Sequence, residues 1–336
     1  MKRKKYDIDK AFKNWNRLNP PINKFSAGVF QLFLKPLFNF EKTTKDCFVE
    51  KKTVVLDNKK IQFLIYTPKN IQHKSPCLIY YHGGGFMLPA APYHYRNARK
   101  YAVSTGYKVF VPDYPLAPKN KFPVPADICF KFYKHILKNC VALNVNPDKI
   151  IVGGDSAGAN LAAIVCLMAS DNKIKTPAAQ MLIYPVISPK EPTQSMLEFD
   201  TTGMCNSKDV EKYCKLYFEK EEDKLHRYAS PLNQEDLSKY PPTYVETAEF
   251  DCLRDEGQMF AKKLQENKVQ VATHFTEKTI HGYDIVKNSA IVEESLLKRI
   301  EFLSQINNKK EGWYKLSFFF HFYFLIQSFM VWYKRN

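Results

Sequence analysis

The sequence predicts an α/β protein in which helices cover both faces of a mostly parallel sheet. Its 336 residues are 45% hydrophobic and 25% charged, a globular composition with enough apolar material for a large core. Short runs rich in β-branched and aromatic residues recur along the chain and, from residue 76 onward, alternate with helical patterns. Strands that alternate with helices pair in parallel, because each helix returns the chain to the same edge of the sheet.

The expected elements run from an N-terminal helical segment into eight strands and the helices between them. Residues 1–45 are expected to form one or two amphipathic helices, which the Pro20-Pro21 pair separates. Strands are expected at 52–57, 60–66, 76–81, 107–112, 148–153, 180–185, 242–247 and 269–275, with Asn58-Lys59 as the turn of a first hairpin. Helices are expected at 94–105, 125–139, 156–170, 255–267 and 290–305.

The most specific motif is Gly154-Asp155-Ser156-Ala157-Gly158, which follows an apolar run and opens an apolar helix. A serine on a sharp turn between a strand and a helix needs a glycine two residues away on each side, because a larger residue would clash. The start of the helix favours developing negative charge. This context is typical of a nucleophile elbow, although the motif alone also fits a glycine-rich turn that binds phosphate.

A run of three glycines forms the second motif, His82-Gly83-Gly84-Gly85-Phe86, directly after the strand expected at 76–81. Three successive glycines cost much chain entropy. They allow backbone N–H groups to approach a negatively charged group closely, and in acyl transfer that group is the tetrahedral oxyanion. A flexible loop is the alternative, which the presence of the serine motif makes less attractive.

Two further candidates follow expected strands near the end of the chain. Asp251 comes after the strand at 242–247, and His281 comes after the strand at 269–275. The chain order Ser156, Asp251, His281 leaves room for one insertion and one strand–helix unit between them. All three residues stand at the carboxyl ends of expected strands, where sheets of this kind place their sites.

Together these motifs resemble the hormone-sensitive-lipase-like family of α/β-hydrolase esterases. The resemblance covers roughly residues 46–306 and is carried by HGGGF at 82–86, GDSAG at 154–158, the D-x-L-R-D segment at 251–255 and HGY at 281–283. Residues 113–118 also resemble the D-Y-R-L-A-P stretch of many members, with Pro115 in place of the usual arginine. The resemblance implies an α/β-hydrolase fold with a mostly parallel eight-stranded sheet and a helical cap.

The resemblance also assigns roles to the motif residues. Ser156 is implied as the nucleophile, His281 as the general base and then acid, and Asp251 as the carboxylate that orients the histidine. The implied oxyanion hole consists of backbone N–H groups. They belong to Gly84 and Gly85, with Gly83 as a third candidate, and to Ala157. No metal and no organic cofactor is implied.

This resemblance divides the chain into three parts. Residues 1–45 are expected to be N-terminal cap helices, residues 46–306 the catalytic domain with a polar cap insertion at about 189–230, and residues 307–336 an aromatic-rich tail. Several aromatic and apolar residues of the expected cap either line an acyl pocket or are ordinary packing: Phe25, Phe30, Phe33, Phe38, Met196, Leu197, Tyr213, Tyr217 and Phe218.

The charge balance raises nucleic acid or anionic lipid as partners, since the formal net charge is +16. More than half of that excess lies in the terminal segments 1–20 and 305–336, and the body carries no nucleic-acid-binding signature. We therefore expect no nucleic-acid partner. The sequence leaves the oligomeric state open, a homodimer included.

The eight cysteines contain no C-x-x-C pair and are sparse for a disulfide scaffold. The basic N-terminus lacks the apolar stretch of a signal peptide. These features favour a cytoplasmic protein. The apolar segment 316–333 is bracketed by basic residues and is marginally long for a bilayer. It is interpreted as a membrane-associating tail, a packed or disordered appendage, or a non-native extension.

The leading functional hypothesis is a serine hydrolase that cleaves small esters with short to medium acyl chains. The alternative enzyme is an amide, formamide or lactone hydrolase with the same three residues. The non-catalytic alternative is a ligand-binding receptor on the same scaffold. The receptor relative of this family lacks the histidine, and His281 is present here.

Overall fold

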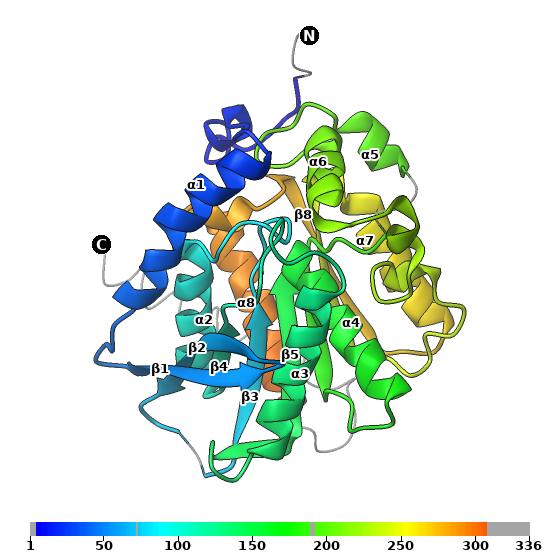
Figure 1. The fold of residues 1–336 in the computed structure, drawn as a ribbon. Helices are drawn as coiled ribbons and strands as arrows, with labels where there is room; N and C mark the ends of the chain where they lie inside the picture. Colours follow the sequence, from blue (N-terminus) through cyan, green and yellow to red (C-terminus); the bar gives the residue numbers. More distant parts are fainter. Residues whose placement is uncertain (1–4, 72, 189–191, 308–336) are drawn as a thin grey trace.

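The computed structural model describes residues 5–71, 73–188 and 192–307 and contains a central sheet of eight strands in the order β1-β2-β4-β3-β5-β6-β7-β8 (Figure 1). The strands are β1 (Cys47–Leu56), β2 (Lys59–Pro68), β3 (Ser75–Tyr81), β4 (Lys108–Pro112), β5 (Val145–Asp155), β6 (Ala179–Ile183), β7 (Thr243–Phe250) and β8 (Val271–Ile280). Strand β2 runs antiparallel to both of its neighbours, and the other neighbouring pairs are parallel. The predicted α/β class with an eight-stranded, mostly parallel sheet is confirmed.

The first hairpin turns one residue earlier than the sequence suggested. Asp57 and Asn58 both have positive φ, 48° and 58°, and Lys59 already belongs to β2. Two successive residues with positive φ define a type I′ turn, whose twist matches that of the paired strands. Asp and Asn tolerate this backbone region better than lysine does, which explains why the turn falls on these two residues.

Helices cover both faces of the sheet, as predicted. They are α1 (Lys24–Leu34), α2 (Pro92–Thr105), α3 (Val124–Lys138), α4 (Ala157–Asp171), α5 (Gln194–Glu198), α6 (Ser207–Tyr217), α7 (Arg254–Glu266) and α8 (Ala290–Asn307). One buried cluster joins the sheet to α3, α4 and α7, and a second joins its other face to α2 and α8. The helices α3, α4 and α7 therefore lie on one face and α2 and α8 on the other. Because the strands from β3 to β8 are parallel, their carboxyl ends share one edge of the sheet.

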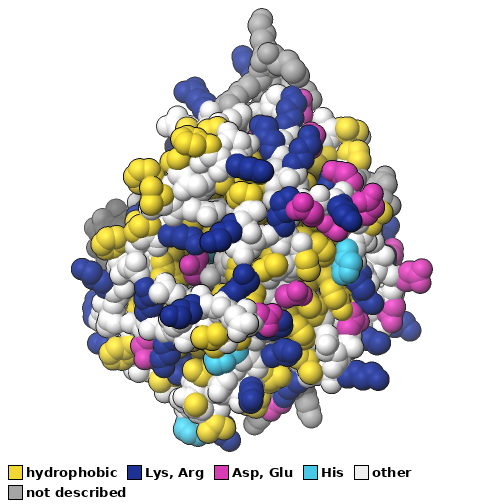
Figure 2. All heavy atoms as spheres, viewed as in Figure 1, with side chains coloured by type: hydrophobic (Ala, Val, Ile, Leu, Met, Phe, Trp, Pro, Cys, Tyr) yellow, Lys and Arg dark blue, Asp and Glu magenta, His cyan; other side chains and the backbone are white. Residues whose placement is uncertain are grey.

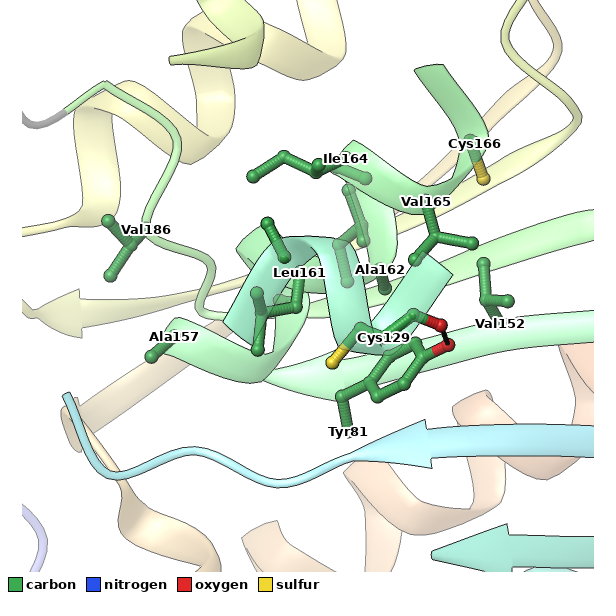
Figure 3. Packing of buried hydrophobic residues seen from close by; sticks show 14 of the residues in the cluster. Tyr81, Cys129, Val152, Ala157, Leu161, Ala162, Ile164, Val165, Cys166 and Val186 are labelled. Carbon is green, nitrogen blue, oxygen red and sulfur yellow. Dashed lines mark hydrogen bonds between the residues drawn. The ribbon is translucent and has the colours of Figure 1, made fainter. Parts of the chain in front are cut away.

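Helix α4 is buried on all sides from Ala157 to Ala169. Figure 3 shows its side chains, among them Leu161, Ile164 and Val165, packed against the sheet and the neighbouring helix. The hydroxyl of Tyr81 donates to the carbonyl of Cys129 at 3.0 Å within this core. A helix that is apolar on all sides needs such burial, and the burial fixes its N-terminus rigidly at the edge of the sheet.

The N-terminal segment and the middle segment form a second layer above the strand ends, with α1, α5 and α6 at the top of Figure 1. We call residues 5–45 and 192–233 the upper layer. Its two segments are joined by backbone contacts, since Met204 N–H donates to Leu18 O at 2.8 Å and Gly203 N–H donates to the Asn16 side chain at 2.7 Å. Among the residues described before the Pro20-Pro21 pair, Trp15–Arg17 form a 3₁₀ turn, and after the pair comes the expected helix α1.

Candidate active site

Ser156 occupies a strained turn between β5 and α4. Its backbone has φ 53° and ψ −119°, a region that L-residues rarely adopt. A Cβ at Gly154 would lie 2.3 Å from Tyr81 O, and a Cβ at Gly158 would lie 2.0 Å from the same oxygen. The two flanking glycines are therefore required by the close passage of β3 behind the turn.

The turn brings Ser156 into contact with His281, which in turn contacts Asp251, although both residues are far from the serine in the sequence. His281 Nε2 lies 2.8 Å from Ser156 Oγ, and His281 Nδ1 lies 2.8 Å from Asp251 Oδ2. The second oxygen of Asp251 accepts the N–H of Leu253 at 2.9 Å. All three side chains are buried. Asp251 follows β7 and His281 follows β8, so the carboxyl ends of strands β5, β7 and β8 supply the three groups.

The electrostatics of these three side chains depend on the buried carboxylate of Asp251. Burial disfavours the charged imidazolium, but the negative charge of Asp251 and its hydrogen bond outweigh that effect. They raise the pKa of His281 to about 9. The carboxylate at Nδ1 also orients the ring, which leaves Nε2 aimed at the serine hydroxyl.

The glycine run after β3 leaves two donors free beside the turn. Gly84 and Gly85 have positive φ, 113° and 60°, and a Cβ at Gly85 would lie 2.3 Å from the ring of Tyr213. Among the described residues, no hydrogen-bond acceptor is found for the N–H groups of Gly84, Gly85 or Ala157. Ala157 is the first residue of α4, so the helix itself supplies no acceptor for its N–H.

Gly83, the third candidate donor of the oxyanion hole, differs from Gly84 and Gly85. Its N–H donates to Asp155 Oδ1 at 3.0 Å, so it is committed to a protein acceptor. The same carboxylate accepts the hydroxyls of Tyr80 at 2.8 Å and Tyr93 at 3.0 Å. Asp155 thus anchors the glycine run against the serine turn.

Two buried histidines support the glycine run and lie apart from Ser156 in the hydrogen-bond network. His94 Nε2 lies 3.1 Å from Asp155 Oδ2. Burial would raise the pKa of Asp155, but His94 and the hydrogen bonds hold it well below its usual range. His82 stacks on Tyr114 and its Nδ1 lies 2.8 Å from Gly83 O, while burial lowers the pKa of His82 to about 3. Both residues therefore support the conformation of the loop.

A cavity of about 310 Å³ lies beside this group, between α5, α6 and the start of α7. Its walls include Val186, Met196, Val210 and Glu256. Val186 connects the cavity to the turn, because its N–H donates to Ser156 O at 3.2 Å. The walls are mostly apolar, and charged side chains of α6 and the following turn, Lys208, Glu211 and Lys224, stand among them.

The aromatic and apolar residues expected in the cap divide into three groups. Met196 and Leu197 line the cavity. Phe38, Tyr217 and Phe218 are buried in the core, and the ring of Tyr217 stacks on Phe86 at 3.9 Å. Phe25 and Phe33 point to solvent. Met196 and Leu197 of α5 therefore border a cavity, whereas Phe25 and Phe33 of α1 neither line it nor pack in the core.

Glu256 and Tyr184 were not singled out in the sequence. Glu256 accepts the N–H groups of Ile187 at 2.8 Å and Ser188 at 3.2 Å, and burial raises its pKa to about 8. The ring of Tyr184 packs edge-on against His281 at 4.9 Å. No local sequence pattern predicts either contact, because each joins segments that are distant in the chain. Arg254 forms an ion pair with Asp255 at 2.9 Å.

Comparison with known proteins supports the same fold. Residues 78–285 match a family model described as the α/β hydrolase fold. The chain is 30% identical over 240 residues to the carboxylesterase NlhH of Mycobacterium tuberculosis, covering 70% of this chain and 75% of that protein. It is 31% identical over 231 residues to an arylesterase of Saccharolobus solfataricus, covering 68% and 75%.

A solved esterase from Pyrobaculum calidifontis superimposes with a TM-score of 0.81 at 30% identity, covering 89% of this chain and 99% of that one. The fold and the serine-centred arrangement define an α/β hydrolase. The chain belongs to the hormone-sensitive-lipase-like family of α/β-hydrolase esterases.

Other expectations concern metals, thiols and membranes. In residues 5–71, 73–188 and 192–307, no cluster of three or more His, Cys, Asp or Glu is placed to hold a metal ion. The eight cysteines are buried and unpaired. None of the helices that the structure describes is both long and apolar enough to span a bilayer. The tail segment 316–333 lies outside the described residues.

Proposed function

We propose that this protein hydrolyses carboxylic esters with short to medium acyl chains through an acyl-enzyme on Ser156. The observation that carries the proposal is the continuous contact from Ser156 Oγ through His281 to Asp251, with 2.8 Å at each step. A serine hydroxyl is a weak nucleophile until a base removes its proton, and His281 Nε2 is within reach of that proton. The names of the carboxylesterase and arylesterase relatives support an ester as the substrate.

The reaction proceeds in two halves. Neutral His281 accepts the Ser156 proton while Oγ attacks the ester carbonyl carbon, and the imidazolium then protonates the leaving alcohol as the C–O bond breaks. Water attacks the acyl-enzyme in the second half, with His281 accepting its proton and returning it to Ser156. Asp251 holds the tautomer with the proton on Nδ1 and stabilises the imidazolium that forms in each half.

The oxyanion forms where three N–H groups have no other acceptor among the described residues. Gly84, Gly85 and Ala157 donate to the developing negative charge, and Ala157 adds the positive end of the α4 dipole. Gly83 serves this hole indirectly, because its bond to Asp155 fixes the conformation of the run. Loss of one such donor typically costs about 10²–10³ in rate.

The upper layer acts as a cap, and the cavity beneath α5 and α6 takes the acyl group. Its volume of about 310 Å³ is at the small end of ligand pockets, which favours short to medium chains. The apolar walls from Val186, Met196 and Val210 suit an alkyl chain. Val186 places this wall directly beside the serine turn.

The decisive measurement is hydrolysis of p-nitrophenyl esters from acetate to dodecanoate by the wild type and by Ser156→Ala. We expect turnover by the wild type and a loss of roughly 10⁴-fold or more in the variant, because no other group supplies the nucleophile. Ser207→Ala is the matched control, since it removes another hydroxyl that borders the cavity and should leave the rate within a few-fold. A serine-reactive phosphonate should label Ser156 covalently. A folded wild type without turnover or labelling above Ser156→Ala would rule the proposal out.

A further inference from the structure

Helix α1 carries an apolar stripe on the side that faces solvent. Phe25, Leu32 and Phe33 are 81%, 72% and 71% exposed, and Val29 between them is also exposed. Positions 25, 29, 32 and 33 follow the spacing of a single helical face. We call these four residues the outer face of α1. Figure 2 shows hydrophobic side chains in the upper left, over the position of α1 in Figure 1, with basic side chains around them.

The opposite side of α1 is fixed to the body of the protein, so the outer face is held outward. Ser26 and Ala27 are buried, and Ala27 packs in a small cluster with Met87 and Leu216. Gln31 Nε2 donates to Met87 O at 3.0 Å and to the carbonyl of Ala117 at 2.9 Å. These contacts hold the outer face of α1 toward solvent.

The N-terminus of the helix adds to this anchoring. Asn23 and Ser26 form a reciprocal cap, in which Ser26 N–H donates to Asn23 Oδ1 at 2.9 Å and Asn23 N–H donates to Ser26 Oγ at 3.0 Å. A capped helix seated by two side-chain hydrogen bonds presents a rigid surface. Large apolar side chains gathered on such a surface mark an interaction site more often than chance exposure does.

The charge around the outer face is positive. Lys24 and Lys35 bracket α1, and Lys42 and Lys45 follow within the same segment. The one acid between residues 24 and 45, Glu41, is paired with Arg99 at 2.6 Å. Within the part of the chain that the structure describes, none of these four lysines forms an ion pair. The charge of Lys35 also acts on the carboxylate of Asp113, whereas Lys24, Lys42 and Lys45 leave their charge available to a partner.

We propose that the outer face of α1 binds a lipid surface that carries anionic headgroups. An amphipathic helix with aromatic residues on one face and lysines at its borders lies in the headgroup region, where apolar burial and attraction to anionic lipid act together. A second copy of this chain is a poorer occupant, because it would bring the same lysines against each other. The proposal stands apart from ester hydrolysis. It adds that esters dissolved in the surface meet the cap directly, since α1 rests on the loop that follows the glycine run.

The test is flotation of the full chain with vesicles of phosphatidylcholine, with and without phosphatidylglycerol. We expect binding that increases with phosphatidylglycerol and decreases with salt. Phe25→Ser/Leu32→Ser/Phe33→Ser should lower the partition coefficient by roughly 100-fold or more, since three large apolar groups are lost. Lys24→Gln/Lys35→Gln should lower it by roughly fivefold per lysine on anionic vesicles only.

The matched control removes three exposed apolar side chains elsewhere, in Val141→Ser/Met259→Ser/Leu297→Ser, and should bind vesicles as the wild type does. Unchanged thermal melting and unchanged turnover of p-nitrophenyl acetate show that the α1 variant is folded. The proposal is overturned by a wild type that does not bind anionic vesicles, or by equal binding of the α1 variant and the control. It is also overturned if binding is lost only on Phe318→Ser/Phe320→Ser/Phe322→Ser, since the tail would then hold the lipid. A dimer that the α1 variant abolishes, without vesicle binding, would assign the face to a second copy.

Discussion

His281 is the residue whose protonation state decides the proposed chemistry. It must be neutral to accept the serine proton, yet the charge of Asp251, against the effect of burial, raises its pKa to about 9. The same contact that orients the ring therefore limits the fraction of active enzyme near neutral pH. The contact also stabilises the imidazolium that forms during each half-reaction.

The pH dependence follows from this raised pKa. Below about pH 9 the protonated histidine cannot act as a base, so kcat/KM should rise about tenfold per pH unit and level off near the pKa of His281. Asp251→Asn removes the anion, so the rising part of the profile should move to lower pH while the plateau falls by about 10⁴. The profile is measured with p-nitrophenyl acetate, corrected for spontaneous hydrolysis.

Asp255→Asn is the control for this experiment. Asp255 is a nearby carboxylate that contacts Ser195 and Arg254 and has no contact with the histidine. Its variant should keep the wild-type profile. An Asp251→Asn profile that rises at the same pH as the wild type would show that Asp251 does not set the pKa of His281.

At the scale of elements, α5 and α6 close the space above the serine turn. Their placement rests on contacts with the body such as the packing of Tyr213 on Gly85 and the bond of Ser195 Oγ to Cys252 O at 2.9 Å. Met196 extends from α5 into the cavity wall. The upper layer can therefore determine which acyl chains fit without altering the turn itself.

Met196→Trp should narrow the cavity and shift the preference toward shorter chains. We expect the ratio of dodecanoate to acetate turnover to fall by about tenfold or more, because even one methylene of fit in an apolar pocket is worth that order of discrimination. Met259→Trp, a substitution at an exposed site on α7, is the control and should leave the ratio unchanged. If both variants keep the wild-type chain-length profile, the acyl group does not occupy this cavity.

At the scale of the whole molecule, a buried ion network joins the last helix to the sheet. Arg299 of α8 is fully buried and donates to Glu246 Oε2 at 2.9 Å and to Asp284 Oδ1 at 3.0 Å. Burial would raise the pKa of Glu246, but the arginine lowers it and keeps the carboxylate charged. Asp284, which lies three residues after His281, also accepts a hydrogen bond from the hydroxyl of Tyr184 at 2.8 Å. The network thus holds the histidine loop to α8.

Arg299→Met should destabilise the protein by about 3–5 kcal/mol, because it leaves two buried carboxylates without their cation. Urea unfolding followed by circular dichroism measures the loss. Lys175→Met is the control: it breaks the surface pair with Asp148 and should cost about 0–1 kcal/mol. Equal stability of the two variants would mean that the buried pair contributes nothing beyond a surface pair.

Much of this molecule follows from local sequence patterns. The alternation of apolar runs and helical patterns predicts the order of elements, because each strand and helix has its own periodicity. The glycines on both sides of Ser156 predict the sharp turn, since only glycine fits beside β3. The motif order also predicts that Asp251 and His281 belong with Ser156, because parallel strands end at one edge of the sheet.

Only the tertiary structure decided which backbone N–H groups have an acceptor and which aromatic side chains are buried. Gly83 and Gly84 are equivalent in the sequence, yet the fold gives Gly83 an acceptor in Asp155 and leaves Gly84 without one among the described residues. Phe25 and Tyr217 are both aromatic residues of the upper layer, yet one is exposed and the other is core. Local patterns determine what an element is, whereas a partner far along the chain determines what each side chain touches, and that contact sets its burial and its charge state.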